Sequence, residues 1–205
     1  DIGYKALAVN LSDLAAAGAI PRAFFLTIGL PARDDAWLAG FTKGMTELSR
    51  QAGCPLLGGD TTRTAKVGDI HAPVTISITA MGELPQSMGL TRSGARPGDD
   101  IWVSGCVGGA WAALMHRWGK LTLDARVFPA AALAMDRPNP RNALGTALLS
   151  SATACADISD GLAQDLGHIL ERSGVDADVL WDAVPKHPAL AALSQEQQVE
   201  AAMSG

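Results

Sequence analysis

Three acidic positions in the sequence combine residue types that could bind a divalent cation. Asp13 lies in a stretch with helical periodicity, Asp60 follows two glycines and precedes Thr61-Thr62, and Asp157 begins the segment Asp157-Ile158-Ser159-Asp160-Gly161. Carboxylate and hydroxyl oxygens are the ligands that hard cations such as Mg²⁺ prefer. If the three positions converge, their negative charges repel unless cations lie between them. Magnesium bound to polyphosphate oxygens is the usual apparatus of phosphoryl transfer, so the pattern points to that chemistry.

Each position also has a purely structural interpretation. Asp13 taken alone is more typical of a solvated surface residue, and Asp60 could stabilise a Gly-Gly-Asp turn through its own side-chain hydrogen bonds. Ser159 as an N-cap and Asp160 near the positive end of the helix dipole are fully explained as helix-capping groups. This interpretation leaves Asp157 unexplained. The combination of positions, rather than any one of them, therefore carries the hypothesis.

A phosphate-binding arginine is required by the same hypothesis, and Arg92 is the candidate. It lies in Leu90-Thr91-Arg92-Ser93-Gly94-Ala95, between the two halves of the sequence, from which a guanidinium could reach a site formed between domains. An ordinary exposed linker arginine is the competing interpretation, and the residues alone favour it. The glycine-rich segment 105–109 matches neither the GxGxxG nor the P-loop pattern, so neither dinucleotide nor Walker-type binding is indicated.

Helices and strands in the first half of the chain must position Asp13 and Asp60. Leucines and a glycine recur at helical spacing up to Gly18, which predicts a first helix that ends there. The stripe consists of Leu7, Leu11, Leu14 and Gly18. The remaining predicted elements are a strand over 24–28, a helix over 36–52, a strand over 54–57 that Gly58-Gly59 ends, and a strand over 74–79.

The second half is predicted to begin after a junction at residues 82–98, which is rich in Gly, Pro, Ser and Arg and lacks periodicity. Short apolar strands are expected at 101–103 and 154–156, and the second of them leads into the Asp157 segment. Alternation of strands and helices indicates the α/β class. The helix that follows the Asp157 segment is expected to bury Leu162, Leu166, Ile169 and Leu170.

Composition excludes several other classes of protein. The 205 residues are 48% hydrophobic and include 22 glycines, which is typical of globular proteins. A net charge of −5, with Lys and Arg scattered singly, argues against nucleic acid as a partner. The three cysteines lack metal-type spacing, and no apolar run reaches the ~18 residues of a membrane helix. We therefore expect a cytoplasmic protein that binds neither nucleic acid nor membrane.

Taken in order, four segments of the chain resemble the thiamine-monophosphate kinase family, whose superfamily includes aminoimidazole ribonucleotide synthetase and selenophosphate synthetase. They are residues 1–16, 57–63 (Leu-Gly-Gly-Asp-Thr-Thr-Arg), 91–95 (Thr-Arg-Ser-Gly-Ala) and 157–162 (Asp-Ile-Ser-Asp-Gly-Leu). The resemblance implies a two-domain α/β architecture like that of aminoimidazole ribonucleotide synthetase. An N-terminal α+β domain over 1–84 would form a barrel of strands across a homodimer, and a C-terminal α/β domain would cover 98–205.

The activity that the resemblance implies is phosphorylation of thiamine monophosphate to thiamine diphosphate. ATP would supply its γ-phosphate by direct transfer, assisted by several Mg²⁺ ions. For site residues the resemblance implies Asp13, Asp60, Asp157 and Asp160 as metal ligands, Gly59, Asp60, Arg92 and Ser159 as nucleotide contacts, and Arg92 and Asp160 as catalytic groups.

The family pattern also has segments that would precede Asp1 and follow Gly205, among them further metal-binding acids and the substrate-contacting residues. We therefore expect a chain truncated at both ends, which by itself lacks part of the site. Two other interpretations stay open: a sister ATP-using enzyme of the same superfamily, and an inactive fragment that dimerises or binds nucleotide.

Overall fold

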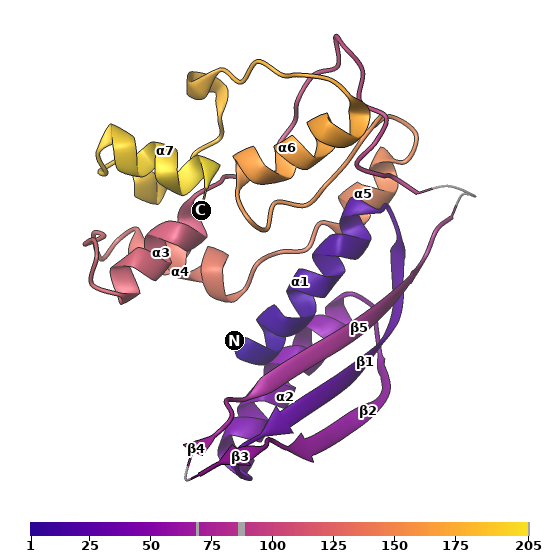
Figure 1. Ribbon diagram of the computed structural model, residues 1–205, viewed down its shortest axis with the longest axis vertical. Helices are drawn as coiled ribbons and strands as arrows, with labels where there is room; N and C mark the ends of the chain where they lie inside the picture. Colours follow the sequence, from indigo (N-terminus) through magenta and orange to yellow (C-terminus); the bar gives the residue numbers. More distant parts are fainter. Residues whose placement is uncertain (69, 86–88, 205) are drawn as a thin grey trace. The chain divides into compact units, whose positions relative to one another are not determined.

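The computed structural model describes residues 1–68, 70–85 and 89–204. The chain forms two compact units (Figure 1). The first consists of Asp1–Gly89 with Pro140–Leu149, and the second of Leu90–Asn139 with Ser150–Gly205. Residues 140–149 thus return to the first unit after the chain has begun the second.

The first unit is a three-stranded sheet with helices on one of its faces. The central strand β1 (Ile20–Leu30) runs parallel to β2 (Leu56–Arg63) and antiparallel to β5 (Thr75–Glu83). Helices α1 (Ile2–Ala16) and α2 (Asp35–Gln51) lie on the same side of this sheet (Figure 1). The unit also contains a hairpin of β3 (Lys66–Val67) and β4 (Ile70–His71), and helix α5 (Asn142–Leu148).

Helix α1 buries the stripe that its periodicity predicts. Leu7 and Leu11 are fully buried, and Leu14 packs at the edge of the same core. Across from them, Phe24 and Ile28 of β1 complete that core. Burying one such side chain stabilises the fold by about 1.5–3 kcal/mol, so these contacts hold the helix to the sheet.

The helix predicted over 36–52 is confirmed as α2. Its first turn is capped by Asp34, whose Oδ1 accepts a hydrogen bond from the backbone N–H of Trp37 at 2.9 Å. Phe41, Met45 and Leu48 are buried in the same core as α1. The amphipathic pattern of the sequence therefore identified both helices that cover the sheet.

Strand β2 is longer than the sequence indicates. The prediction that Gly58-Gly59 ends the strand is wrong, because β2 continues through Asp60 to Arg63. A Cβ at Gly59 would lie only 1.8 Å from the backbone oxygen of Leu26 on β1, so the strands approach to a distance that glycine alone permits. Asp60 consequently lies within a strand and not after one.

The second unit is helical, and its described residues contain no strand. The predicted strands at 101–103 and 154–156 are wrong, because neither segment pairs with a neighbouring strand within the described chain. An isolated bridge joins Val107 to Lys186. The helices are α3 (Gly109–Arg117), α4 (Phe128–Asp136), α6 (Leu162–Ser173) and α7 (Gln195–Met203), with 3₁₀ turns η1 (Trp181–Ala183) and η2 (Pro188–Leu190).

Helix α6 is the helix predicted after the Asp157 segment. Leu162 is buried as expected, whereas Leu166, Ile169 and Leu170 are half-buried. None of the helices in the described ranges is long and apolar enough to cross a membrane.

The imidazole of His187 makes the stability of the second unit sensitive to acid. Its Nδ1 accepts a hydrogen bond from the N–H of Ala189 at 3.1 Å, and burial lowers the pKa of His187 below its ordinary value of 6.5. A lowered pKa means that the unfolded chain binds the proton more readily. The contribution of His187 to stability is therefore complete above about pH 6.5 and is lost as the pH falls through the folded pKa.

We expect the His187→Asn variant to lose less thermal stability than the wild type when the pH is lowered from 7.5 to 5.5. Asparagine keeps a side-chain acceptor at this capping position but does not titrate. Thermal unfolding at both pH values measures the difference. Equal losses of thermal stability in the two proteins would show that His187 does not contribute to the pH dependence.

Candidate functional site

Asp60 lies on the face of the sheet that α1 and α2 leave uncovered. In the strand register it stands beside Thr27 of β1, which in turn faces Ser77 of β5. Thr27 is exposed while its neighbour Ile28 is buried against the helices, and residues paired across strands point to the same face. Asp60 is therefore exposed on the same face of the sheet as the hydroxyl side chains of Thr27 and Ser77.

A hollow of about 340 Å³ lies on this open face, and Asp60 is not among the residues that line it. Hydroxyl side chains from all three strands line it, and Arg63 supplies a positive charge at its rim. The Nε of Arg63 donates to the backbone oxygen of Pro31 at 3.3 Å, which holds the guanidinium near the end of β1. The lining is Thr27, Gly29, Thr62, Arg63, Thr64, Ala65, Ala72, Thr75 and Ser77.

Asp13 belongs to a different layer of the first unit. It is exposed near the C-terminal end of α1, and its backbone oxygen accepts a hydrogen bond from the N–H of Ala17 at 3.1 Å. Because α1 covers one face of the sheet and Asp60 projects from the other, the fold of this unit places the two carboxylates on different layers. The sequence pattern had suggested convergence without indicating which face each residue would occupy.

In the second unit, the Arg92 segment lies beside the strand-like residues that lead to Asp157. The backbone N–H of Cys155 donates to the oxygen of Thr91 at 2.9 Å. The hydroxyl of Ser173, at the end of α6, donates to the oxygen of Arg92 at 3.3 Å and accepts from the N–H groups of residues 94 and 95 at 3.2 Å each. The structure thus places the Arg92 segment beside residues that flank the Asp157 segment and its helix, and Arg92 is exposed.

Burial, hydrogen bonds and charge around this junction shift the pKa of two ionisable groups. Burial and the nearby charge of Asp157 raise the pKa of the Cys155 thiol. The hydroxyl of Thr153, 2.7 Å away, and the backbone N–H of Arg96, 2.9 Å away, lower the pKa of Asp99. Asp157 therefore lies half-buried, close to the Cys155 thiol.

The loop 157–161 is held from within by the first turn of α6. Asp165 is 5% exposed, and its Oδ2 accepts hydrogen bonds from the N–H of Ser159 at 2.8 Å and the N–H of Asp160 at 3.0 Å. Gln164 donates from Nε2 to the Oδ2 of Asp160 at 3.2 Å. Ser159 and Asp160 are exposed, so the loop presents their side chains to solvent.

Asp165 is a residue that the sequence analysis missed. A signal was present, because Asp165 lies three residues after Leu162 and four before Ile169, on the predicted inner face of the helix. An acid on the apolar face of an amphipathic helix is buried only when hydrogen-bond donors satisfy it.

The donor atoms of both units suit a hard cation. In the described part of the chain, no ion pair joins Asp60 or Asp157 to a basic side chain, and their oxygens are the ligand type that Mg²⁺ takes. Within residues 1–68, 70–85 and 89–204 there is no group of three or more His, Cys, Asp or Glu side chains close enough to hold a metal ion.

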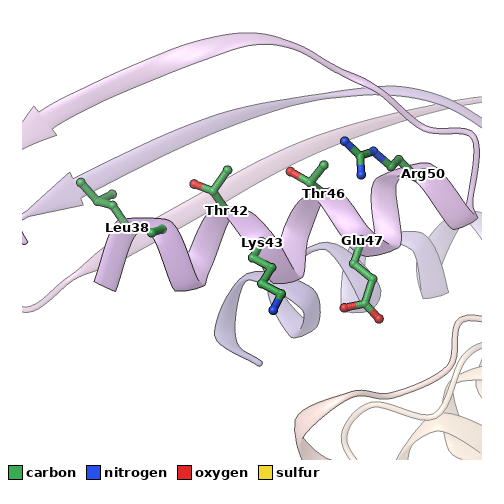
Figure 2. Close-up of a pocket in the computed structure, with 7 residues that line it drawn as sticks. Leu38, Thr42, Lys43, Thr46, Glu47 and Arg50 are labelled. Atoms are coloured by element: carbon green, nitrogen blue, oxygen red, sulfur yellow. The ribbon is translucent and has the colours of Figure 1, made fainter. Parts of the chain in front are cut away.

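A larger hollow, of about 730 Å³, contains none of the candidate residues. It runs along α2, and every residue that lines it belongs to that helix. Figure 2 shows Leu38, Thr42, Thr46 and Arg50 pointing to one side, with Lys43 and Glu47 pointing to the other. Since no other element in the described part of the chain lines this space, it is an open helix face and we assign it no chemistry.

Comparison with known proteins shows that this chain is similar to AIR synthase related proteins and to thiamine-monophosphate kinases. Residues 1–84 match the family of the AIR synthase related protein, N-terminal domain. The thiamine-monophosphate kinase of Salmonella typhimurium is 42% identical over 93% of this chain and 56% of its own length. The crystal structure of that kinase from Stenotrophomonas maltophilia is 41% identical, with a TM-score of 0.91 over 100% of this chain and 64% of the other.

A further solved structure, AaThiL complexed with AMPPCP and TMP, is 27% identical with a TM-score of 0.85. The alignment covers 99% of this chain and 64% of that protein. The chain therefore spans between about half and two thirds of the length of these relatives.

Proposed function

We propose that the protein is a thiamine-phosphate kinase, because residues 1–84 match the AIR synthase related N-terminal domain family and the chain resembles thiamine-monophosphate kinases along nearly its whole length. One observation carries the proposal: this chain shares its fold with a relative solved in complex with AMPPCP and TMP. The order of the four motif segments and the hydrogen bond from Cys155, just before the Asp157 segment, to Thr91 of the Arg92 segment support it.

In the proposed reaction, an oxygen of thiamine monophosphate attacks the γ-phosphorus of ATP. The bond from the γ-phosphorus to the oxygen that bridges it to the β-phosphate breaks, which yields ADP and thiamine diphosphate. Bound Mg²⁺ would neutralise the polyphosphate charge, and positioning supplies most of the remaining catalysis. The proposed metal ligands are Asp13, Asp60, Asp157 and Asp160, with Gly59, Asp60, Ser159 and Arg92 contacting the nucleotide. Because Asp13 and Asp60 lie on different layers of the first unit, they would bind different ions.

Arg92 and Asp160 are the proposed catalytic groups. The exposed guanidinium of Arg92 suits binding of the charged oxygens of the phosphate chain, because it presents several donors in one plane. Asp160 lies at the start of α6, where the positive end of the helix dipole favours negative charge. Gln164 holds its carboxylate in one orientation through the hydrogen bond to Oδ2.

We also propose a homodimer, with the strands of the first unit forming a barrel across the two copies. The open face of the sheet exposes Phe25 and Met81, each 41% accessible, and the edge strand β2 exposes Leu57. A second copy would bury these apolar groups and pair the free strand edges. Sedimentation of the full-length protein tests this, and a monomeric mass at micromolar concentration contradicts it. The free cysteines fit a reducing, cytoplasmic setting.

The full-length protein is expected to form thiamine diphosphate and ADP from thiamine monophosphate and ATP. Removal of divalent cations with EDTA should abolish turnover, and added Mg²⁺ should restore it, because the carboxylates cannot bind polyphosphate without cations. Thiamine without its phosphate serves as the control acceptor. Absence of thiamine diphosphate in the presence of Mg²⁺ would overturn the proposal, and turnover of the substrates of sister enzymes instead would favour the superfamily alternative.

The inactive-fragment interpretation is tested on the 205-residue chain itself. Titration with Mg-ATP separates a nucleotide-binding module, which binds without turnover, from a remnant that does not bind.

A further inference from the structure

Asp165 is the buried charged group in the part of the chain that the structure describes. Its carboxylate is bound by N–H groups that do not belong to its own helix. Helix α6 begins at Leu162, whereas Ser159 and Asp160, which donate to Asp165 Oδ2 at 2.8 and 3.0 Å, precede that helix. An ordinary capping acid satisfies N–H groups of its own first turn. Asp165 instead accepts hydrogen bonds from the backbone of the loop that carries three of the proposed site residues.

We propose that Asp165 is a positioning residue that sets the conformation of the 157–161 loop for Mg-nucleotide binding. Two N–H groups converge on one buried carboxylate oxygen, and hydrogen bonds to a charged acceptor are roughly twice as strong as neutral ones. The loop backbone is thereby drawn towards the unit interior while the side chains of Ser159 and Asp160 stay exposed. The functional half of this inference rests on the proposed kinase activity.

Two other contacts fix the same loop, and among the described residues Asp165 is the buried charge to which the loop is bonded. Gly161 has φ +118°, and a Cβ there would lie 2.7 Å from the backbone oxygen of Met203, so the end of the loop is pressed against the end of α7. Gln164 orients the Asp160 carboxylate. Because these contacts act on Gly161 and on a side chain, the backbone at residues 159 and 160 depends on Asp165.

The first test measures the loop itself and requires no activity. In the full-length protein, Asp165→Ala should raise amide hydrogen exchange of the 157–161 segment by about 10-fold or more, because both N–H groups lose their acceptor. Asp165→Asn, whose amide oxygen can still accept both bonds without a charge, should lie between the alanine variant and the wild type. Glu171→Ala, an exposed acid on the same helix, is the matched control and should leave the segment unchanged.

The second test measures how the loss of Asp165 affects Mg²⁺ binding at the proposed site. In kinase assays, Asp165→Ala should raise the Mg²⁺ concentration for half-maximal activity by about 10–100-fold, as loss of a residue that orients metal ligands typically does. The KM for thiamine monophosphate should not change, and Asp165→Asn should recover most of the Mg²⁺ affinity. General loosening of the fold would be expected to change both the Mg²⁺ requirement and the KM for thiamine monophosphate. A change in the Mg²⁺ requirement alone would therefore indicate a specific role.

The proposal is overturned if loop exchange in Asp165→Ala equals that in Glu171→Ala, or if exchange rises while the Mg²⁺ requirement stays the same. Should Asp165→Ala fail to fold, Asp165→Asn decides alone: faster loop exchange than in the wild type supports the proposal, and equal exchange refutes it. If the wild-type protein shows no kinase activity, the proposed function fails, while hydrogen exchange still decides whether Asp165 holds the loop.

Discussion

Replacing Asp157 by asparagine in the full-length protein is expected to lower kcat/KM by more than about 100-fold. Changing residues that only orient metal ligands typically costs roughly 10–100-fold, so loss of Asp157, a proposed direct ligand, should exceed that range. The substitution keeps the size of the side chain and removes one negative charge from a half-buried position. Steady-state kinetics at saturating Mg²⁺ measure the loss, and Asp60→Asn should show an effect of the same order.

Asp176→Asn provides the matched control for this experiment. Asp176 is exposed in the second unit and has no proposed role, so the same change of charge there should leave kcat/KM within about twofold of the wild type. Thermal unfolding of all variants shows whether activity is lost with the fold intact. Wild-type rates in either Asp157→Asn or Asp60→Asn would contradict the proposed metal ligands.

Gly59→Ala is expected to destabilise the first unit by about 3 kcal/mol or more, which for a domain of this size lowers Tm by roughly 10 °C or more. The added Cβ would lie 1.8 Å from the backbone oxygen of Leu26, and the atom it meets is backbone in the central strand. Flexible side chains cannot relieve such an overlap, so β1 and β2 must separate. Strand pairing next to Asp60 would be lost with it.

The neighbouring glycine offers a control of the same chemistry. A Cβ at Gly58 would lie 3.7 Å from the ring of Phe25, which is ordinary van der Waals contact. Gly58→Ala should therefore change Tm only slightly, and thermal unfolding of the two variants side by side makes the comparison. A similar Tm for both variants would contradict the close approach of β1 and β2.

The local pattern predicted the first unit well. Periodicity correctly predicted that Leu7 and Leu11 of α1 are buried, and it predicted the helix α2. In amphipathic helices of this length, the spacing of the apolar residues identifies the buried face. The length of β2 was misjudged at Gly58-Gly59. In many contexts this pair is a turn signal, and only the oxygen of Leu26 on the adjacent strand shows that it is a close strand contact.

The second unit was predicted less well for a related reason. Short apolar segments such as 101–103 and 154–156 have strand composition, but a strand exists only when another backbone completes its hydrogen bonds. In the described chain, the N–H of Cys155 bonds instead to the loop oxygen of Thr91. Composition can indicate a strand, but the backbone that hydrogen-bonds to it must come from elsewhere in the fold.

The sequence alone determined the family resemblance, the types of residue available for cation and phosphate binding, and the helices with regular apolar spacing. Those features depend on residue identity and on short-range periodicity. Tertiary structure decided that Asp60 projects from the open face of the sheet, that the Arg92 segment meets the residues before Asp157, and that Asp165 bonds the loop 157–161. Each of these depends on contacts between distant backbone groups, whose partners no local pattern of side chains can specify.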